Sequence, residues 1–114
     1  MNQKVRLETL LAGVEADRIP EYFALFNLGV VDSLRNGLLD AEDAVRFFYH
    51  ADNSLYVKDR LANRSAGELM GRGAQLADLF DALPAGEARR EFLRELATMH
   101  ELCLKLIEEQ QSVA

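Results

Sequence analysis

The chain has 114 residues, enough for one hydrophobic core and too few for two, so we expect a single domain over residues 1–114. Apolar residues make up 49% and charged residues 28% of the sequence, a balance that excludes a disordered or fibrous protein. The formal net charge of -6 disfavours nucleic acid and anionic membranes as partners, because attraction to phosphate requires a positive potential.

Cysteine content and hydropathy indicate the compartment. Cys103 is the only cysteine, so the sequence provides no internal disulfide and needs no oxidising environment. The first 16 residues contain no apolar core of signal-peptide length, and no run of 18 apolar residues follows. We therefore expect a cytoplasmic protein that does not enter the membrane.

The first predicted helix spans about residues 4–16. Its apolar residues, spaced as one helical face, are Leu7, Leu10, Leu11 and Val14. Pro20 then fits the first turn of a second helix, where its missing N–H removes no hydrogen bond. This second helix, about residues 20–39, is apolar on most sides, which predicts that other elements cover it and that it forms the centre of the fold.

Two glycines interrupt the predicted central helix. Gly29 lies in its most apolar part, where the cost of a glycine predicts a close helix crossing. Asn36 and Gly37 fit a left-handed C-cap, after which Leu38 and Leu39 would form a tight, buried linker.

The sequence in the middle of the chain predicts two further short elements of secondary structure. Asp40 is a suitable N-cap for a helix over about residues 41–50. Residues 51–54 are typical of a turn, and residues 55–62 fit a short element that is either helical or extended.

Two longer helices complete the prediction. Ser65 and Glu68 match a capping box at the start of a helix that continues to about residue 82. The final helix spans about residues 86–110 and is the longest. The expected fold is thus all-α, a bundle of five or six helices.

The final helix carries a seam with heptad spacing. Candidate interface residues on this helix are Phe92, Leu96, Met99, Leu102, Cys103 and Leu106. The seam either completes the core of a monomer or also joins two copies in a homodimer, since twofold pairs are the commonest soluble oligomers. Leu102 and Leu104 lie off the main seam and favour the second interpretation.

Few residues are candidates for metal binding or catalysis. His100 and Cys103 are one helical turn apart, but two ligands do not make a metal site, so we predict neither metal nor cofactor. His50 is best explained as a cap of exposed carbonyls at a helix C-terminus. No catalytic motif occurs, and an enzymatic function is the less favoured one.

A surface or pocket site is the remaining candidate. Its residues are Tyr49, His50, Tyr56, Arg64 and Arg72. Lys58 and Arg60, with Arg64 and Arg72, form the only local concentration of positive charge, which is typical of a solvated surface in so acidic a chain.

Three segments resemble a family of small bacterial helical proteins of unknown function. They are LFNLGVVDSLRNG (residues 25–37), AEDA (41–44) and GAQLAD (73–78), within the middle two thirds of the chain. The resemblance implies a helical fold and no activity.

Two hypotheses for the function follow. The first is a protein-interaction or regulatory module that acts through an acidic helical surface, as a homodimer. The alternative is a small-molecule-binding or enzymatic helical bundle with a pocket beside the central helix.

Overall fold

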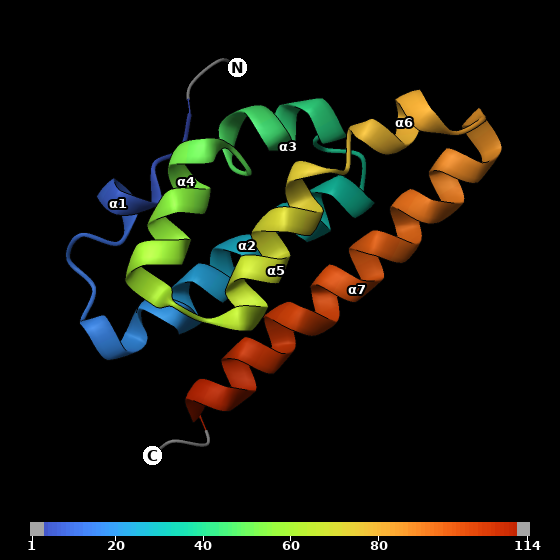
Figure 1. Cartoon of the computed structure of the whole chain (residues 1–114). Helices are drawn as coiled ribbons and strands as arrows, with labels where there is room; N and C mark the ends of the chain where they lie inside the picture. Colours follow the sequence, from blue (N-terminus) through green and yellow to red (C-terminus); the bar gives the residue numbers. More distant parts are fainter. Residues whose placement is uncertain (1–3, 112–114) are drawn as a thin grey trace.

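The computed structural model describes residues 4–111, and every regular element in this range is a helix (Figure 1). The elements are α1 (Leu7–Leu10), a 3-10 turn (Ala16–Arg18), α2 (Ile19–Arg35), α3 (Ala41–Phe47), α4 (Ala51–Tyr56), a π-helical turn (Val57–Leu61), α5 (Arg64–Ala74), α6 (Asp78–Ala82) and α7 (Ala85–Gln111). The predicted all-α class and the long C-terminal helix are confirmed. The helices outnumber the five or six predicted, because one predicted helix is divided into α5 and α6.

The core lies where α7 crosses α2 and α5. In Figure 1, α7 runs along the length of the molecule beside both helices, and α2 and α7 share the largest interface. Phe23 and Val31 of α2 and Leu96 and Met99 of α7 are fully covered there. Burial of each such side chain contributes about 1.5–3 kcal/mol, so this interface is a large source of the stability of the fold.

The central helix is covered on fewer sides than predicted. Leu25 is 49% and Phe26 41% exposed, so one side of α2 faces solvent. The prediction overestimated the burial of α2 because it rested on the number of apolar residues. A surface helix buries only one stripe along its length, and in α2 this stripe is centred on Asn27.

A left-handed residue ends α2, as predicted. Gly37 has a φ of 73°, its N–H donates to Leu34 O at 3.3 Å, and the N–H of Leu38 donates to Ser33 O at 2.9 Å. These two bonds are those of a Schellman motif. The predicted burial of the following linker is wrong for Leu38, which is 80% exposed, while Leu39 is half-buried.

The close approach predicted at Gly29 is also wrong. A Cβ at Gly29 would meet no atom within 4 Å, whereas a Cβ at Gly73 would overlap the ring of Tyr49. The crossing that requires a glycine therefore lies between α5 and the end of α3. The sequence around Gly29 is more apolar than that around Gly73. However, a glycine is needed only where another element packs against it, and that element is present at Gly73.

The first helix is much shorter than predicted, because the preceding backbone bonds to other parts of the chain. The N–H of Val5 donates to Phe47 O at 2.8 Å, and the N–H of Leu7 donates to the side chain of Asn53 at 2.9 Å. Residues 4–6 are therefore extended, and a turn follows Leu10. The apolar pattern identified Leu7 and Leu11 correctly as core residues.

His50 begins a helix and does not end one. The predicted helix over residues 41–50 stops at Phe47, and residues 51–54, predicted as a turn, form the start of α4. The Nδ1 atom of His50 accepts a hydrogen bond from the N–H of Asn53 at 3.4 Å and so caps α4. Asp40 caps α3 as predicted, accepting from the N–H of Asp43 at 2.8 Å.

The N-cap of α5 is two residues earlier than predicted. The side chain of Asn63 accepts from the N–H of Ala66 at 3.1 Å, and Ser65 is buried inside the first turn. Ala62, which precedes Asn63, is in the left-handed region with a φ of 48° and ends the π-helical turn. The element over residues 55–62 is thus helical, one of the two predicted forms.

Candidate functional site

An open groove of about 700 Å³ lies between the α2–α3 connection, α6 and α7. Its apolar lining includes Leu34, Leu38, Leu39, Phe80 and Phe92. Leu34 and Phe92 are buried and belong to the core, whereas Leu38 and Phe80 are 80% and 46% exposed. We call this site the acidic groove, because its remaining lining residues are dominated by carboxylates.

Four carboxylates line the acidic groove against one guanidinium. They are Asp40, Glu42, Asp43 and Asp81, and the guanidinium is that of Arg89. Asp40 is held in place as the N-cap of α3, and Asp43 pairs with Arg46 at 3.4 Å. Carboxylates beside an apolar surface of low polarizability produce a local negative potential, which attracts a cationic ligand.

Local sequence explains why Leu38 projects into solvent. In a Schellman motif the residue after the left-handed glycine usually packs on an apolar residue at the third position from the helix end. That position is Ser33 here, so the motif offers Leu38 no apolar partner. Leu38 is a site residue that sequence reasoning missed, and the serine was the signal that could have identified it.

Phe80 is held at the surface by an aromatic contact. Its ring lies edge-to-face with that of Phe92, with 5.3 Å between the centroids. The contact fixes one side of the Phe80 ring and leaves the other toward solvent. The groove therefore has one rigid aromatic wall, on α6, and one exposed leucine, on the α2–α3 connection.

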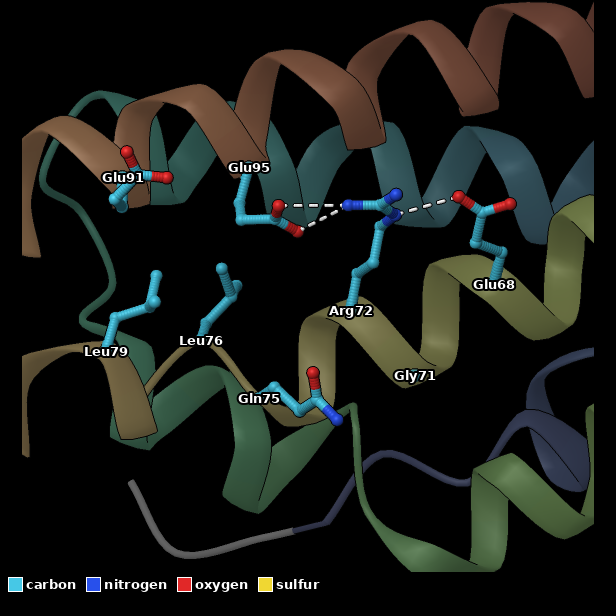
Figure 2. Close-up of a pocket in the computed structure, with 8 residues that line it drawn as sticks. All are labelled: Glu68, Gly71, Arg72, Gln75, Leu76, Leu79, Glu91 and Glu95. Carbon is cyan, nitrogen blue, oxygen red and sulfur yellow. Dashed lines mark hydrogen bonds and ion pairs between the residues drawn. The ribbon is translucent and has the colours of Figure 1, made fainter. Parts of the chain in front are cut away.

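A second open groove, of about 560 Å³, lies between α5, the start of α6 and α7 (Figure 2). Its side chains are Glu68, Arg72, Gln75, Leu76, Leu79, Glu91 and Glu95. The two grooves together make the surface around α6 rich in carboxylates.

Arg72 crosses the second groove and ties two helices together. Figure 2 shows its guanidinium between Glu95 of α7 and Glu68 of α5. One nitrogen, Nη1, donates to both oxygens of Glu95 at 2.9 Å, and Nε donates to Glu68 at 2.8 Å. The hydrogen bonds to Glu95, then those to Glu68, raise the pKa of Arg72, so the guanidinium stays charged.

The predicted interface residues are covered within one chain. Phe92, Leu96, Met99, Cys103 and Leu106 are buried, and only Leu102 is half-exposed. These side chains pack in the core beside α2 and α5. The seam therefore packs in the core of the single chain, and whether Leu102 also contacts a second copy stays a prediction.

The structure does not gather the five predicted pocket residues. Arg72 lines the second groove, Arg64 lines a separate groove at the start of α5, and Tyr56 lines another beside Leu11. Tyr49 is buried, and His50 is half-buried at the start of α4.

The predicted basic patch is also divided. Lys58 and Arg64 line the groove at the start of α5, Arg60 lies over the ring of Tyr56 at 5.8 Å, and Arg72 is ion-paired elsewhere. Within residues 4–111, no group of three or more His, Cys, Asp or Glu side chains is placed to hold a metal ion. His100 is half-buried and Cys103 is in the core.

A buried polar contact lies in the core beside these surfaces. The hydroxyl of Tyr49 donates to Asn27 Oδ1 at 2.7 Å, while Asn27 Nδ2 has no hydrogen-bond partner. Burial, and secondarily Cys103, raises the pKa of Tyr49, so its hydroxyl keeps its proton. This contact joins the segment between α3 and α4 to α2.

The molecule is thus a helical protein with a groove beside α6 that four carboxylates line. None of the helices within residues 4–111 is long and apolar enough to cross a membrane. A family model described as "Protein of unknown function (DUF3969)" matches residues 14–114, so the chain belongs to this family. The comparisons with curated proteins and with solved structures found no match.

The family match confirms the resemblance to a family of unknown function and extends it beyond the middle two thirds of the chain. The bacterial origin stays a prediction. The family description assigns no activity, so any function has to be argued from the geometry of the site.

Proposed function

We propose that the protein is an interaction module whose acidic groove binds a basic amphipathic segment of another protein. The observation that supports this most is the position of Leu38 and Phe80. Both are large apolar side chains that the fold leaves exposed, and both line one groove with four carboxylates. An apolar surface with a polar rim is typical of a site that binds a protein partner.

The shape and charge of the groove support a basic amphipathic helix as the partner. An amphipathic helix places apolar residues at i, i+3, i+4 and i+7 on one face, which suits a groove with Leu38 and Phe80 as contacts. Lysine or arginine on the flanks of that helix would lie near Glu42 and Asp81. The negative charge favours fast association and selects against acidic partners. A cytoplasmic partner fits a chain whose single cysteine is free.

A homodimer is a separate proposal, supported by different residues. Leu25 and Phe26 form an exposed apolar pair on α2, away from the buried seam of α7. Isologous contact of two such pairs would cover both. Light scattering at micromolar concentration distinguishes the two states, and Phe26→Glu should convert a dimer to a species of 12.8 kDa. A wild-type mass of 12.8 kDa would contradict this proposal without affecting the acidic groove.

A short peptide of leucine and lysine, with its leucines on one helical face, tests the chemistry of the groove. We expect fluorescence anisotropy to show saturable binding that weakens as salt is added. Leu38→Asp and Asp81→Lys should each weaken it by about tenfold, equivalent to about 1.4 kcal/mol.

Matched controls separate the groove from general attraction to an acidic protein. Leu55→Asp changes an exposed leucine on α4, and Asp59→Lys changes an exposed carboxylate in the π-helical turn. Both should leave the affinity nearly unchanged. Equal losses for Asp59→Lys and Asp81→Lys would show that net charge alone attracts the peptide, and the groove proposal would then be wrong.

A further inference from the structure

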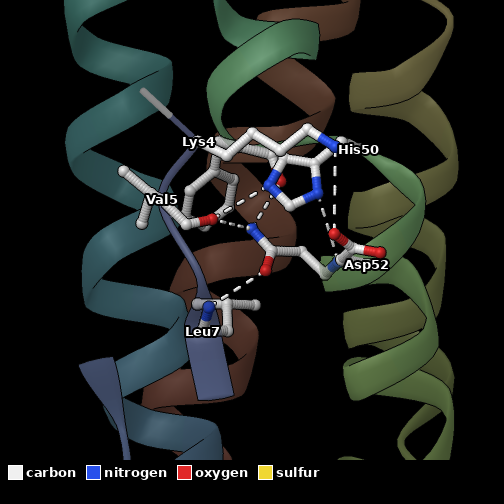
Figure 3. Close-up of polar contacts among 7 residues, drawn as sticks. Lys4, Val5, Leu7, His50 and Asp52 are labelled. Atoms are coloured by element: carbon white, nitrogen blue, oxygen red, sulfur yellow. Dashed lines mark hydrogen bonds and ion pairs between the residues drawn. The ribbon is translucent and has the colours of Figure 1, made fainter. Parts of the chain in front are cut away.

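The first described residues of the chain are held by side chains that contact their backbone (Figure 3). Asn53 Oδ1 accepts from the N–H of Leu7 at 2.9 Å, and Asn53 Nδ2 donates to Val5 O at 2.9 Å and to Phe48 O at 2.8 Å. His50 Nε2 also lies 2.9 Å from Val5 O. Because its Nδ1 accepts from the N–H of Asn53, a neutral His50 carries its proton on Nε2 and donates it to Val5.

The side chains of the same segment also have partners in the fold. Leu7 and Leu11 are fully buried in the core, and Lys4 pairs with Asp52 at 3.8 Å. The site therefore fits an extended backbone that turns into a helix, with a cation at its start and two leucines four residues apart. These are the features by which a peptide-binding site recognises a short segment.

This segment contributes two leucines to the core, but it lies outside the part of the chain that the family model matches. Residues 4–11, which we call the N-terminal arm, precede the part of the chain that the family model matches, whereas His50 and Asn53 lie inside it. Among the helices, α1 contacts mainly α4. An exposed turn that contains Gly13 connects the arm to the rest of the chain.

We propose that the N-terminal arm is a displaceable internal ligand, and that the site at His50 and Asn53 binds the same arm of a second copy of this chain. An exchanged arm would make the contacts of Leu7, Leu11 and Lys4 with the same partners, so the site is complementary to it. The tether gives the chain's own arm a high effective concentration, and the second arm binds when the first is released.

The full-length variant Leu7→Asp/Leu11→Asp should release the arm, because two carboxylates cannot enter the core, and it changes no residue outside the arm. A synthetic peptide of residues 4–12 is the probe, followed by the NMR amide signals of His50 and Asn53. We expect saturable shifts in the variant and at least tenfold weaker binding to the wild-type chain. Adding Asn53→Ala to the variant removes the amide that bonds the arm, so the signal of His50 should no longer shift. A folded variant that gives no shifts, or that binds a scrambled peptide equally well, would overturn the proposal.

Hydrogen exchange of the wild-type chain provides a test that needs no variant. A displaceable arm opens without global unfolding, so the N–H of Leu7 and that of Leu11 should exchange at least tenfold faster than the most protected amides of α2 and α7. Equal protection of the arm and of these helices would show that the arm opens only when the whole chain unfolds, and the proposal would be wrong.

Discussion

At the scale of single residues, the ring of Tyr49 packs directly on Gly73, the one glycine within residues 4–111 at which a Cβ would meet another atom within 4 Å. The ring occupies the space in which a Cβ of residue 73 would lie, and it is buried and hydrogen-bonded to Asn27. We expect Gly73→Ala to lower the free energy of unfolding by about 2 kcal/mol, because overpacking forces the ring or the helix to shift. Chemical denaturation measures the change.

Gly29→Ala is the matched control for that prediction. Gly29 is also helical, but a Cβ there meets no atom within 4 Å. Alanine should therefore stabilise the chain by about 0.7 kcal/mol, the difference in helix propensity. A destabilised Gly29→Ala, or an unchanged Gly73→Ala, would contradict the packing described above.

Cys103 predicts how stability changes in alkali. Burial raises its pKa from 9.0 to about 12, and burial also raises the pKa of Tyr49. Above pH 9.0 the unfolded chain loses the thiol proton while the folded chain keeps it, so the free energy of unfolding falls by about 1.4 kcal/mol per pH unit for this group. Below pH 9.0 the thiol contributes no pH dependence.

Urea denaturation of the wild type and of Cys103→Ala at several pH values measures this effect. The variant loses some packing at every pH, so the comparison concerns the slope with pH and not the absolute stability. We expect a shallower decline for Cys103→Ala between pH 9.0 and about 12. Parallel declines would show that the thiol titrates normally in the folded chain.

At the scale of elements, α7 is the helix on which the others pack. Leu96 is buried between its neighbours, whereas Leu93, one turn earlier, is 40% exposed. We expect Leu96→Ala to cost about 3 kcal/mol through lost contacts and a cavity, and Leu93→Ala about 0.5 kcal/mol or less. Thermal or urea denaturation distinguishes them, and similar losses would place Leu93 at an interface between chains.

The ends of helices were predictable from the sequence where they depend on capping residues close by in the chain. Pro20, the pair Asn36 and Gly37, and Asp40 fixed the ends of α2 and the start of α3, because capping depends on neighbouring residues only. The long periodicity of α7 identified its buried face.

Elements that depend on distant partners were predicted wrongly. The helix expected over residues 4–16 is mostly extended or turn, because Asn53 and Phe47 supply hydrogen bonds from elsewhere in the chain. The acidic groove was missed for a similar reason. Its carboxylates come from the start of α3 and from α6, and only the fold brings Leu38 and Phe80 to one place.

At the scale of the whole molecule, the net charge is -6, and the carboxylates of the two grooves differ in how many have a cationic partner. In the second groove, Arg72 neutralises part of the charge by binding Glu68 and Glu95, which fixes α5 on α7. In the acidic groove, the carboxylates outnumber the one guanidinium, Arg89. The first arrangement ties two helices together, whereas the second supports our proposal of a cationic partner.

NMR mapping of the leucine and lysine peptide on the labelled full-length chain tests the proposed function most directly. We predict that shifted amide signals cluster at residues 38–43, at 78–81 and around Arg89, and that the signals of residues 58–64 do not move. Shifts centred on Leu25 and Phe26, or spread evenly over the carboxylates of the chain, would contradict this prediction.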